Sequence, residues 1–384
     1  MSSCPKLRIE GFTDAWEQRK LGDVTEEFRS GSFIPASRIN TKGEYPVYGG
    51  NGLRGYTNTY NHDGEFALIG RQGALCGNMN YSVGKAYFTE HAVAVKANSL
   101  SDTKFLYYLL SVMRLGQYSD QSAQPGLAVG KLINLQNMFP RSNEQHRIGE
   151  FFYNLDNLIT LHQRRSDALK NAKKYFLKNM FPSEGEKFPK LRLEGFTDAW
   201  EQRKFVETFD FLPNNSLSRA QLTYENGTVK NVHYGDVLIK FGELLDVGNE
   251  ELPYLIDDSL IKNYSSAVLK NGDVVIADAA EDETVGKCSE IKGIKDEKIL
   301  SGLHTIPVRP RVEFENGYLG YFMNSHSYHD QLLPLIQGTK VSSISKKVLE
   351  NTVISYPASS SEQEKIAKFF ESLTNLITLH QRKY

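Results

Sequence analysis

The stretch "NEQHRIGEFFYNLDNLITLHQRR", Asn143–Arg165, returns near the end of the chain as "SEQEKIAKFFESLTNLITLHQRK", Ser361–Lys383. Fourteen of the 23 positions are identical, and "NLITLHQR" is unchanged. In both copies apolar residues recur every three or four positions, which is the period of a helix that packs along a seam on another helix. We therefore predict two long amphipathic helices that pair with each other.

Both copies also carry the signals of a helix start. A proline precedes each, and a serine followed three residues later by glutamine, as in Ser142 and Gln145, fits a capping box. A helix over 144–180 would be roughly 55 Å long. His162 and His380 fall on the predicted seam. Its apolar residues are Ile148, Phe152, Leu155, Ile159, Leu169, Phe176, Ile366, Phe370, Leu373 and Ile377.

A second repeat lies ahead of each helix. "PKLRIEGFTDAWEQRK", Pro5–Lys20, returns as "PKLRLEGFTDAWEQRK", Pro189–Lys204, with 15 of 16 residues identical. Trp16 and Trp200 are the only tryptophans of the chain. Aspartate followed three residues later by glutamate fits a capping box, so we expect a short helical turn anchored by the indole in each copy. A base-stacking tryptophan is the weaker alternative, because tryptophan in an amphipathic turn usually packs in a core.

The repeats frame two inserts, 21–142 and 205–360, that show no similarity which can be aligned by eye. Both inserts have short apolar or β-branched runs separated by glycine, asparagine and aspartate, a pattern typical of strands and tight turns. The predicted fold class is α+β, with two β-rich domains in tandem, an internal pseudo-two-fold repeat, and long helices that pair with each other. The predicted domain limits are 1–142, a central helix 143–183, 184–360, and a distal helix 361–384.

The composition is that of an ordinary globular protein, with 40% hydrophobic and 24% charged residues. No run approaches the ~18 apolar residues of a membrane span, and the N-terminus shows no secretory signal. Three distant cysteines without a CxxC pair argue against a disulfide framework or a zinc site and suit a reducing cytoplasm. The net charge of −1 neither indicates nor excludes nucleic-acid binding, since a local basic surface can be offset elsewhere.

Glycine-rich loops in the inserts carry side chains that can hydrogen-bond to base edges and phosphates, although plain β-turns are the alternative. The long helix between Glu144 and Lys178 has seven Lys or Arg against four Asp or Glu, which suits either a solvated face or contact with DNA phosphates. The candidate DNA-binding residues are Asn51, Arg54, Arg71, Gln72, Asn78 and Lys85 in the first insert, and Lys240, Lys287, His304, Gln337 and Lys340 in the second.

Catalytic signatures are largely absent. The chain has no G-x-x-x-x-G-K-[ST], HExxH or G-x-S-x-G motif. One weak nuclease-like set consists of Asp278, Glu290 and Lys292, a spacing that arises easily by chance in a charge-rich chain. We expect no catalytic residues and no metal site.

In the first half, "GFTDAWEQRKLGDV" is followed by a glycine-rich segment and then by "EQ-x-x-I…LITLHQR". The two repeats "GFTDAWEQRK" and "EQ-x-x-I…LITLHQR" occur together twice in this order, and the arrangement resembles the specificity (S) subunit of type I restriction–modification enzymes over essentially the whole chain. The resemblance implies that each half holds a target recognition domain reading one part of a bipartite double-stranded DNA site. It also implies that the two long helices pair as an antiparallel coiled coil. It implies a non-catalytic, cytoplasmic subunit that positions modification subunits, which methylate adenine N6, and restriction subunits. S-adenosylmethionine, ATP and Mg are then expected on those partners and none on this chain.

The second helical repeat departs from the first at its end. The first copy continues as "SDALKNAKKYFLKNMFP", and the second stops at Tyr384, so we expect a distal helix that is shorter by about 17 residues. Two other functions stay open. One is a stand-alone Mg-dependent endonuclease that uses Asp278, Glu290 and Lys292, and the other is a coiled-coil interaction scaffold that does not bind DNA.

Overall fold

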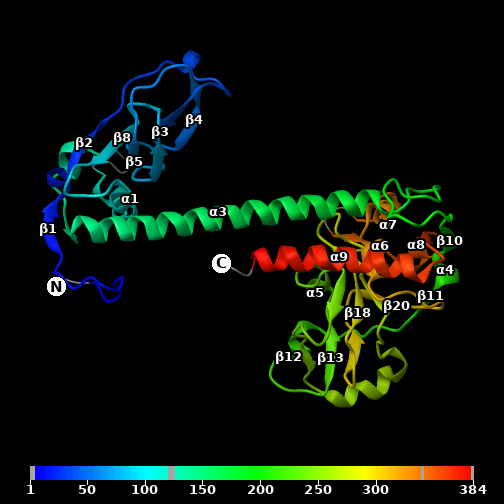
Figure 1. Ribbon diagram of the computed structural model, residues 1–384. Coiled ribbons are helices and arrows are strands. Elements are labelled where there is room, and N and C mark those ends of the chain that lie inside the picture. The colour runs from blue at the N-terminus through cyan, green and yellow to red at the C-terminus, as the bar shows by residue number, and fades with distance from the viewer. Residues whose placement is uncertain (1–4, 120–125, 339–340, 382–384) are drawn as a thin grey trace. The chain divides into compact units, whose positions relative to one another are not determined.

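The computed structural model describes residues 5–119, 126–338 and 341–381 (Figure 1). The chain forms two compact units, Met1–Leu161 and His162–Tyr384. One long helix, α3 (Ser142–Asn179), begins in the first unit and ends in the second. Because the unit boundary falls inside this helix, the domain limits inferred from the repeats remain a prediction. Strands and helices are mixed in both units, as the predicted α+β class requires.

The first unit is rich in short strands. Its elements are β1 (Glu17–Lys20), η1 (Leu21–Val24), β2 (Thr25–Ser30), η2 (Ala36–Arg38), β3 (Tyr45–Gly49), β4 (Gly52–Thr57), β5 (Glu65–Gly70), β6 (Met79–Val83), β7 (Tyr87–Phe88), β8 (Ala92–Ala97), α1 (Thr103–Val112), η3 (Leu115–Tyr118), α2 (Val129–Leu132), β9 (Gln136–Phe139) and the first part of α3. The main sheet is antiparallel with the order β2-β8-β5-β6, and β4-β3-β7 form a smaller sheet. Successive residues of β5 enter different cores, Phe66 one and Ala67 the other, so both faces of the sheet are covered.

The second unit has more elements. They are β10 (Glu201–Lys204), α4 (Phe205–Thr208), β11 (Phe209–Phe211), η4 (Arg219–Gln221), β12 (Leu222–Thr223), β13 (Val229–Val232), α5 (Tyr234–Ile239), β14 (Leu244–Asp246), β15 (Tyr254–Leu255), η5 (Asp258–Ala267), β16 (Val274–Ala277), β17 (Ala279–Ala280), β18 (Cys288–Lys292), β19 (Lys298–Ser301), β20 (Thr305–Pro310), α6 (Tyr318–Met323), α7 (His326–Leu332), η6 (Leu333–Leu335), β21 (Ser342–Ser343), α8 (Lys346–Leu349), β22 (Val353–Tyr356) and α9 (Ser360–Gln381). The main sheet has the order β11-β20-β16-β18-β14, and a second sheet has the order β12-β15-β13-β19.

The two units share a sheet plan that their insert sequences conceal. The order β2-β8-β5-β6 corresponds to β11-β20-β16-β18, and β14 is added beyond it. One main-chain hydrogen bond at the end of the central strand pair is also the same in both units. Beyond β5 and β8, Arg71 N donates to His91 O at 2.9 Å, and beyond β16 and β20, Asp278 N donates to His304 O at 3.1 Å. Ladder bonds use main-chain groups only, so unlike sequences can adopt one plan wherever both keep buried apolar strands.

The repeated "EQRK" is a strand in both halves, so the predicted helical turn is wrong. β1 pairs antiparallel with β9, with Glu17 opposite Phe139, and β10 pairs with β22, with Glu201 opposite Tyr356. The ladder is formed with a segment far along the chain, just before each long helix. Those tertiary hydrogen bonds outweigh the local capping signal, which is a weak preference by comparison.

Both tryptophans pack against their own unit, as predicted. Trp200 is 2% exposed and belongs to the core of the second unit. Trp16 lies edge-on to Phe105, with 6.3 Å between the ring centroids, at the margin of the first core. The indoles therefore fix the start of each unit, with Trp200 buried and Trp16 partly exposed.

An arginine of the short repeat binds a glutamate of the helical repeat in each half. Arg8 Nε and Nη2 donate to Glu144 Oε1 and Oε2 at 2.7 and 2.6 Å. Arg192 makes the same two bonds to Glu362 at 2.8 and 2.9 Å. Both glutamates are 1% exposed, so each pair is bidentate and its carboxylate is buried. We call these two pairs the Arg–Glu clamps.

The long helices begin at the predicted serines, but the glutamines do not close a capping box. Gln145 Nε2 donates to Pro140 O at 2.8 Å, and Gln363 Nε2 donates to Pro357 O at 2.9 Å. Each glutamine side chain therefore ties the helix start to the strand before it.

Within the second unit, α9 runs antiparallel to the C-terminal half of α3 (Figure 1). His162 Nδ1 lies 2.9 Å from His380 Nδ1, and the Phe176 and Phe369 ring centroids are 4.9 Å apart. The two histidines are 218 positions apart (380 − 162), which is the repeat offset (361 − 143). A contact between equivalent residues places the local pseudo-two-fold axis of this helix pair between the two imidazoles.

The predicted seam residues divide between the helix pair and the cores of the units. Phe152 and Leu155 are each 42% exposed. Ile159, Leu169, Phe176 and Leu373 are half-buried. The buried members are Ile366, Phe370 and Ile377, of which Ile366 and Phe370 belong to the second core, while the half-buried Ile148 packs on the first core.

Candidate nucleic-acid interface

Two turns of the first unit meet at a corner lined by glycines. Gly70 ends β5 and Gly50 lies between β3 and β4, and a Cβ on Gly70 would lie only 2.4 Å from Gly50 O. A Cβ on Gly50 would lie 3.1 Å from His91 O and 3.7 Å from Arg71 N. Only glycine permits backbones to approach this closely. We call Gly49–Asn51, Gly70–Gln72 and His91 the first corner.

The first corner brings together three predicted DNA-binding residues, namely Asn51, Arg71 and Gln72. Arg54 lies beside it, since a Cβ on Gly49 would be 2.5 Å from Arg54 Cδ. The Arg71 backbone is fixed, because its N–H donates to His91 O and its carbonyl accepts from Leu127 N, both at 2.9 Å. Neither guanidinium forms an ion pair with a described residue. A fixed backbone with an uncommitted guanidinium can offer paired donors to a guanine edge or a phosphate.

The other two candidates of the first insert lie at opposite ends of β6. Asn78 precedes this strand and borders the first corner, because its carbonyl accepts from Gly70 N at 2.7 Å. Lys85 follows the strand, and its Nζ lies 4.7 Å from the centroid of the Tyr60 ring. The structure therefore joins Asn78 to the first corner and separates Lys85 from it.

The second unit has the same corner in the same place of its sheet. Asp278 follows β16 as Arg71 follows β5, and its carbonyl accepts from Ile344 N at 2.9 Å. His304 Nδ1 lies 3.2 Å from Asp278 Oδ1, and its ring meets Tyr234 edge-on at 5.3 Å. The φ of His304 is +54°, a left-handed conformation that is uncommon outside glycine and is found at functional sites. We call Tyr234, Ala277–Asp278 and His304 the second corner.

The remaining candidates of the second insert have other surroundings. Lys287 Nζ donates to Leu238 O at 2.7 Å, and burial lowers the pKa of this lysine. Lys240 Nζ donates to Glu251 O. Gln337 is exposed and forms an isolated bridge with Ser343, and Lys340 lies outside the described residues. Of the second set, only His304 lies at the second corner.

The sequence did not single out several corner residues. His91 and Tyr234 sit in the corners because of strand pairing, which their local sequence does not reveal. Asn80 has a buried Nδ2 without a hydrogen-bond partner, and a Cβ on Gly52 would lie 2.7 Å from Asn80 Oδ1. Burial raises the pKa of Asp278, while His304 lowers it. The sequence signal that could have found these residues is a polar residue directly before or after a buried strand. Most strands have such a residue, so the signal does not distinguish the corners.

The nuclease-like residues are not assembled into a site. Glu290 accepts hydrogen bonds from Gly317 N and Gly320 N at 2.7 and 2.8 Å. Lys292 Nζ pairs with the Glu371 carboxylate, and Asp278 faces His304 at the second corner. Throughout the described ranges, no group of three or more His, Cys, Asp or Glu could hold a metal ion. In the same ranges, no helix is both long and apolar enough to cross a membrane.

Glu290 should instead make the stability of the second unit depend on pH. Burial raises its pKa from 4.5 to about 7, although the amide N–H donors lower it. Because the pKa is raised in the folded state, the stabilising contribution is complete below about pH 4.5 and is lost as the pH rises through about 7. Urea unfolding of the full chain should show a loss of about 3 kcal/mol over this window from this group.

The substitution Glu290→Gln removes this titration and should flatten the pH profile of unfolding in that window, apart from a constant offset for the altered hydrogen bond. Glu283→Gln, at an exposed position of the same unit, is the matched control and should leave the profile unchanged. Equal profiles for wild type and Glu290→Gln would contradict the assignment.

Two units with one sheet plan, each presenting unlike polar groups at the equivalent corner, define a class: proteins with two tandem modules of one fold and long helices. The sequence model of a family described as "Type I restriction modification DNA specificity domain" matches residues 13–171 and 199–384. The chain belongs to this family. The predicted specificity subunit is thereby confirmed, and neither the endonuclease nor the scaffold alternative gains support.

Known relatives agree with this placement. The specificity subunit of the type I restriction enzyme EcoprrI from Escherichia coli is 42% identical over 146 residues, which are 37% of this chain and 36% of that protein. The MjaVIII specificity subunit from Methanocaldococcus jannaschii is 26% identical over 299 residues, which are 74% and 67% of the two chains. A crystal structure of a type I S subunit from M. genitalium matches with a TM-score of 0.62 at 14% identity, covering 99% of this chain and 94% of that one. This last likeness concerns the fold alone.

Proposed function

We propose that this chain reads a bipartite DNA site, with the first corner reading one part and the second corner the other. One observation carries the proposal: the same position of one shared sheet plan holds Arg71 beside Gln72 in the first unit and Asp278 beside His304 in the second. A constant frame with unlike polar side chains is what two different half-sites require.

The chemistry of each corner suits base edges in the major groove. Arginine pairs with guanine O6 and N7, and glutamine or asparagine pairs with adenine N6 and N7. A carboxylate such as that of Asp278 accepts from cytosine N4. Both corners contain a histidine, His91 and His304, and they differ in that the first has arginine donors and bidentate amides whereas the second has the acceptor Asp278.

Partners and cofactors follow from the family. The chain would act in the cytoplasm without catalysing a reaction, and it would position modification subunits that methylate adenine N6 and restriction subunits that cut DNA. S-adenosylmethionine, ATP and Mg would be bound by those subunits. The buried Arg–Glu clamps support such a role, because they fix each recognition unit to its long helix.

The test is to express the full chain with its modification partner and to sequence the methylated DNA of the host. The expected result is one motif with two specified parts and an unspecified gap, and protection of the same motif in a footprint. A continuous motif would contradict two independent corners. Absence of any protected site would favour the scaffold, and Mg-dependent nicking by the pure chain that is lost in Glu290→Ala would favour the endonuclease.

A further inference from the structure

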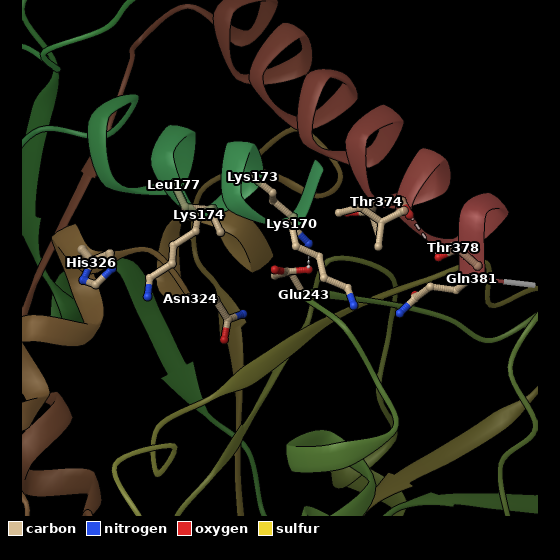
Figure 2. A pocket seen from close by; sticks show the side chains of 11 residues that line it. Lys170, Lys173, Lys174, Leu177, Glu243, Asn324, His326, Thr374, Thr378 and Gln381 are labelled. Carbon is tan, nitrogen blue, oxygen red and sulfur yellow. Dashed lines mark hydrogen bonds and ion pairs between the residues drawn. The ribbon is translucent and has the colours of Figure 1, made fainter. Parts of the chain in front are cut away.

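A groove in the second unit lies between the C-terminal half of α3, the end of α9 and the loops at Glu243 and Asn324 (Figure 2). Its volume is about 400 Å³. One wall is the row of lysines on α3, and the opposite wall is formed by Thr374, Thr378 and Gln381 of α9. The corners described above do not include any of these residues.

The groove holds more positive than negative charge. Lys173 Nζ is paired with Glu243 Oε2 at 2.7 Å, so this lysine is already neutralised. Lys170 and Lys174 are exposed and form no ion pair with any described residue. Figure 2 shows their side chains reaching into the groove on either side of Glu243, with His326 beside Lys174. Two ammonium groups one helical turn apart thus lack a counter-charge.

A further positive charge lies behind this surface. Burial lowers the pKa of Lys287, and the positive charge of Lys173 lowers it further, while Glu243 acts in the opposite sense. One carboxylate, Glu243, faces the cluster, so an anionic ligand would complete the charge balance.

One stretch of chain links the groove to the second corner. Lys287 ends the loop that begins at Asp278, and its Nζ donates to Leu238 O, just before the loop that carries Glu243. The same loop is held to α7 by a contact of 2.9 Å between His329 Nε2 and Val285 O, and α7 begins with the groove residue His326. A strand of DNA leaving the second corner along this loop would meet the lysines of α3.

We propose that the groove binds the DNA backbone, with Lys170 and Lys174 each contacting a phosphate beside the half-site read by the second corner. The inference rests on the proposed DNA-reading function and adds a sequence-independent anchor to it. Contacts to phosphates fix register and orientation without reading bases. An acidic segment of a protein partner would satisfy the same charges, but the chain segment that links the groove to the second corner favours DNA.

The test measures binding of the full chain with its modification partner to a short duplex carrying the methylated motif, and to a scrambled duplex, at several salt concentrations. Lys170→Gln/Lys174→Gln should weaken binding to both duplexes by the same factor and make the slope of log K against log salt shallower by about 2. Lys170→Arg/Lys174→Arg keeps the charges and should retain the wild-type slope.

The matched control is Arg164→Gln/Arg165→Gln, which removes two exposed charges from the same helix outside the groove. It should leave the slope within error of wild type, and thermal unfolding should show that all variants are folded. If the lysine and arginine double variants gave equal slopes of log K against log salt, with motif specificity intact, the groove would not bind DNA. The proposed function would then still stand. Loss of partner binding in place of DNA binding would make the groove a protein site and also overturn it. Absence of motif-specific binding by wild type would overturn both proposals.

Discussion

Arg192→Ala is expected to lower the free energy of unfolding of the second unit by about 3–5 kcal/mol. The change leaves the Glu362 carboxylate buried in its clamp without the two hydrogen bonds that Arg192 supplies. A buried, unpaired charge is far more costly than the loss of an exposed ion pair, because water cannot replace the missing partner. Chemical denaturation of the full chain, followed by tryptophan fluorescence and circular dichroism, measures the effect.

The matched control comes from the same repeat. Arg203 pairs with Glu201 at 3.0 Å, but their side chains are 45% and 42% exposed, so Arg203→Ala should change the free energy of unfolding very little. Replacing both clamp residues, as Arg192→Met/Glu362→Met, should recover much of the loss, because no buried charge remains. A cost for Arg192→Ala no greater than that of Arg203→Ala would show that the clamp does not hold the repeats together.

Exchange of residues 21–142 for the insert of another family member should change the first half of the methylated motif completely and leave the second half as it was. The first corner lies wholly inside this insert, whereas the clamp residues Arg8 and Glu144 lie outside it. The frame therefore stays in place while the reading groups change. Methylome sequencing of hosts that express each chain with the same partner gives both motifs directly.

A point substitution serves as the finer control for this exchange. Arg71→Ala should weaken discrimination at one position of the first half-site by about 1–3 kcal/mol, or roughly 5–150-fold, without effect on the second half-site. If the exchange altered both halves of the motif together, the two corners could not be independent readers.

Several features followed from the sequence because they depend on local order alone. The helical period and the serine starts placed α3 and α9, and the duplicated "NLITLHQR" put His162 and His380 on one seam. Glycine-rich loops with arginine and amide side chains pointed to Arg71 and Gln72. In each case the information lies within a few turns of chain, where periodicity and turn chemistry act.

Other expectations failed where a distant segment decided the outcome. "EQRK" became β1 and β10 because β9 and β22 offered ladder partners, which no capping rule anticipates. A distant segment also sets the surroundings of Lys287, whose Nζ donates to Leu238 O, and its contact with DNA stays a prediction. Burial and contacts between residues distant in sequence determine the surroundings of such side chains, and the neighbouring residues do not reveal either.

The sequence by itself thus determined the repeats, the long helices, the family and the presence of two unlike inserts. Only the tertiary structure decided that the inserts share one sheet plan and that each short repeat is clamped to its helix. It also decided that Arg71 of the first corner and Asp278 of the second occupy equivalent positions. The physical reason is that the hydrogen bonds between paired strands are formed by main-chain groups, so almost any side chain of suitable polarity is compatible with them. Equivalent positions can therefore diverge beyond recognition in sequence while the hydrogen bonds that define them stay the same.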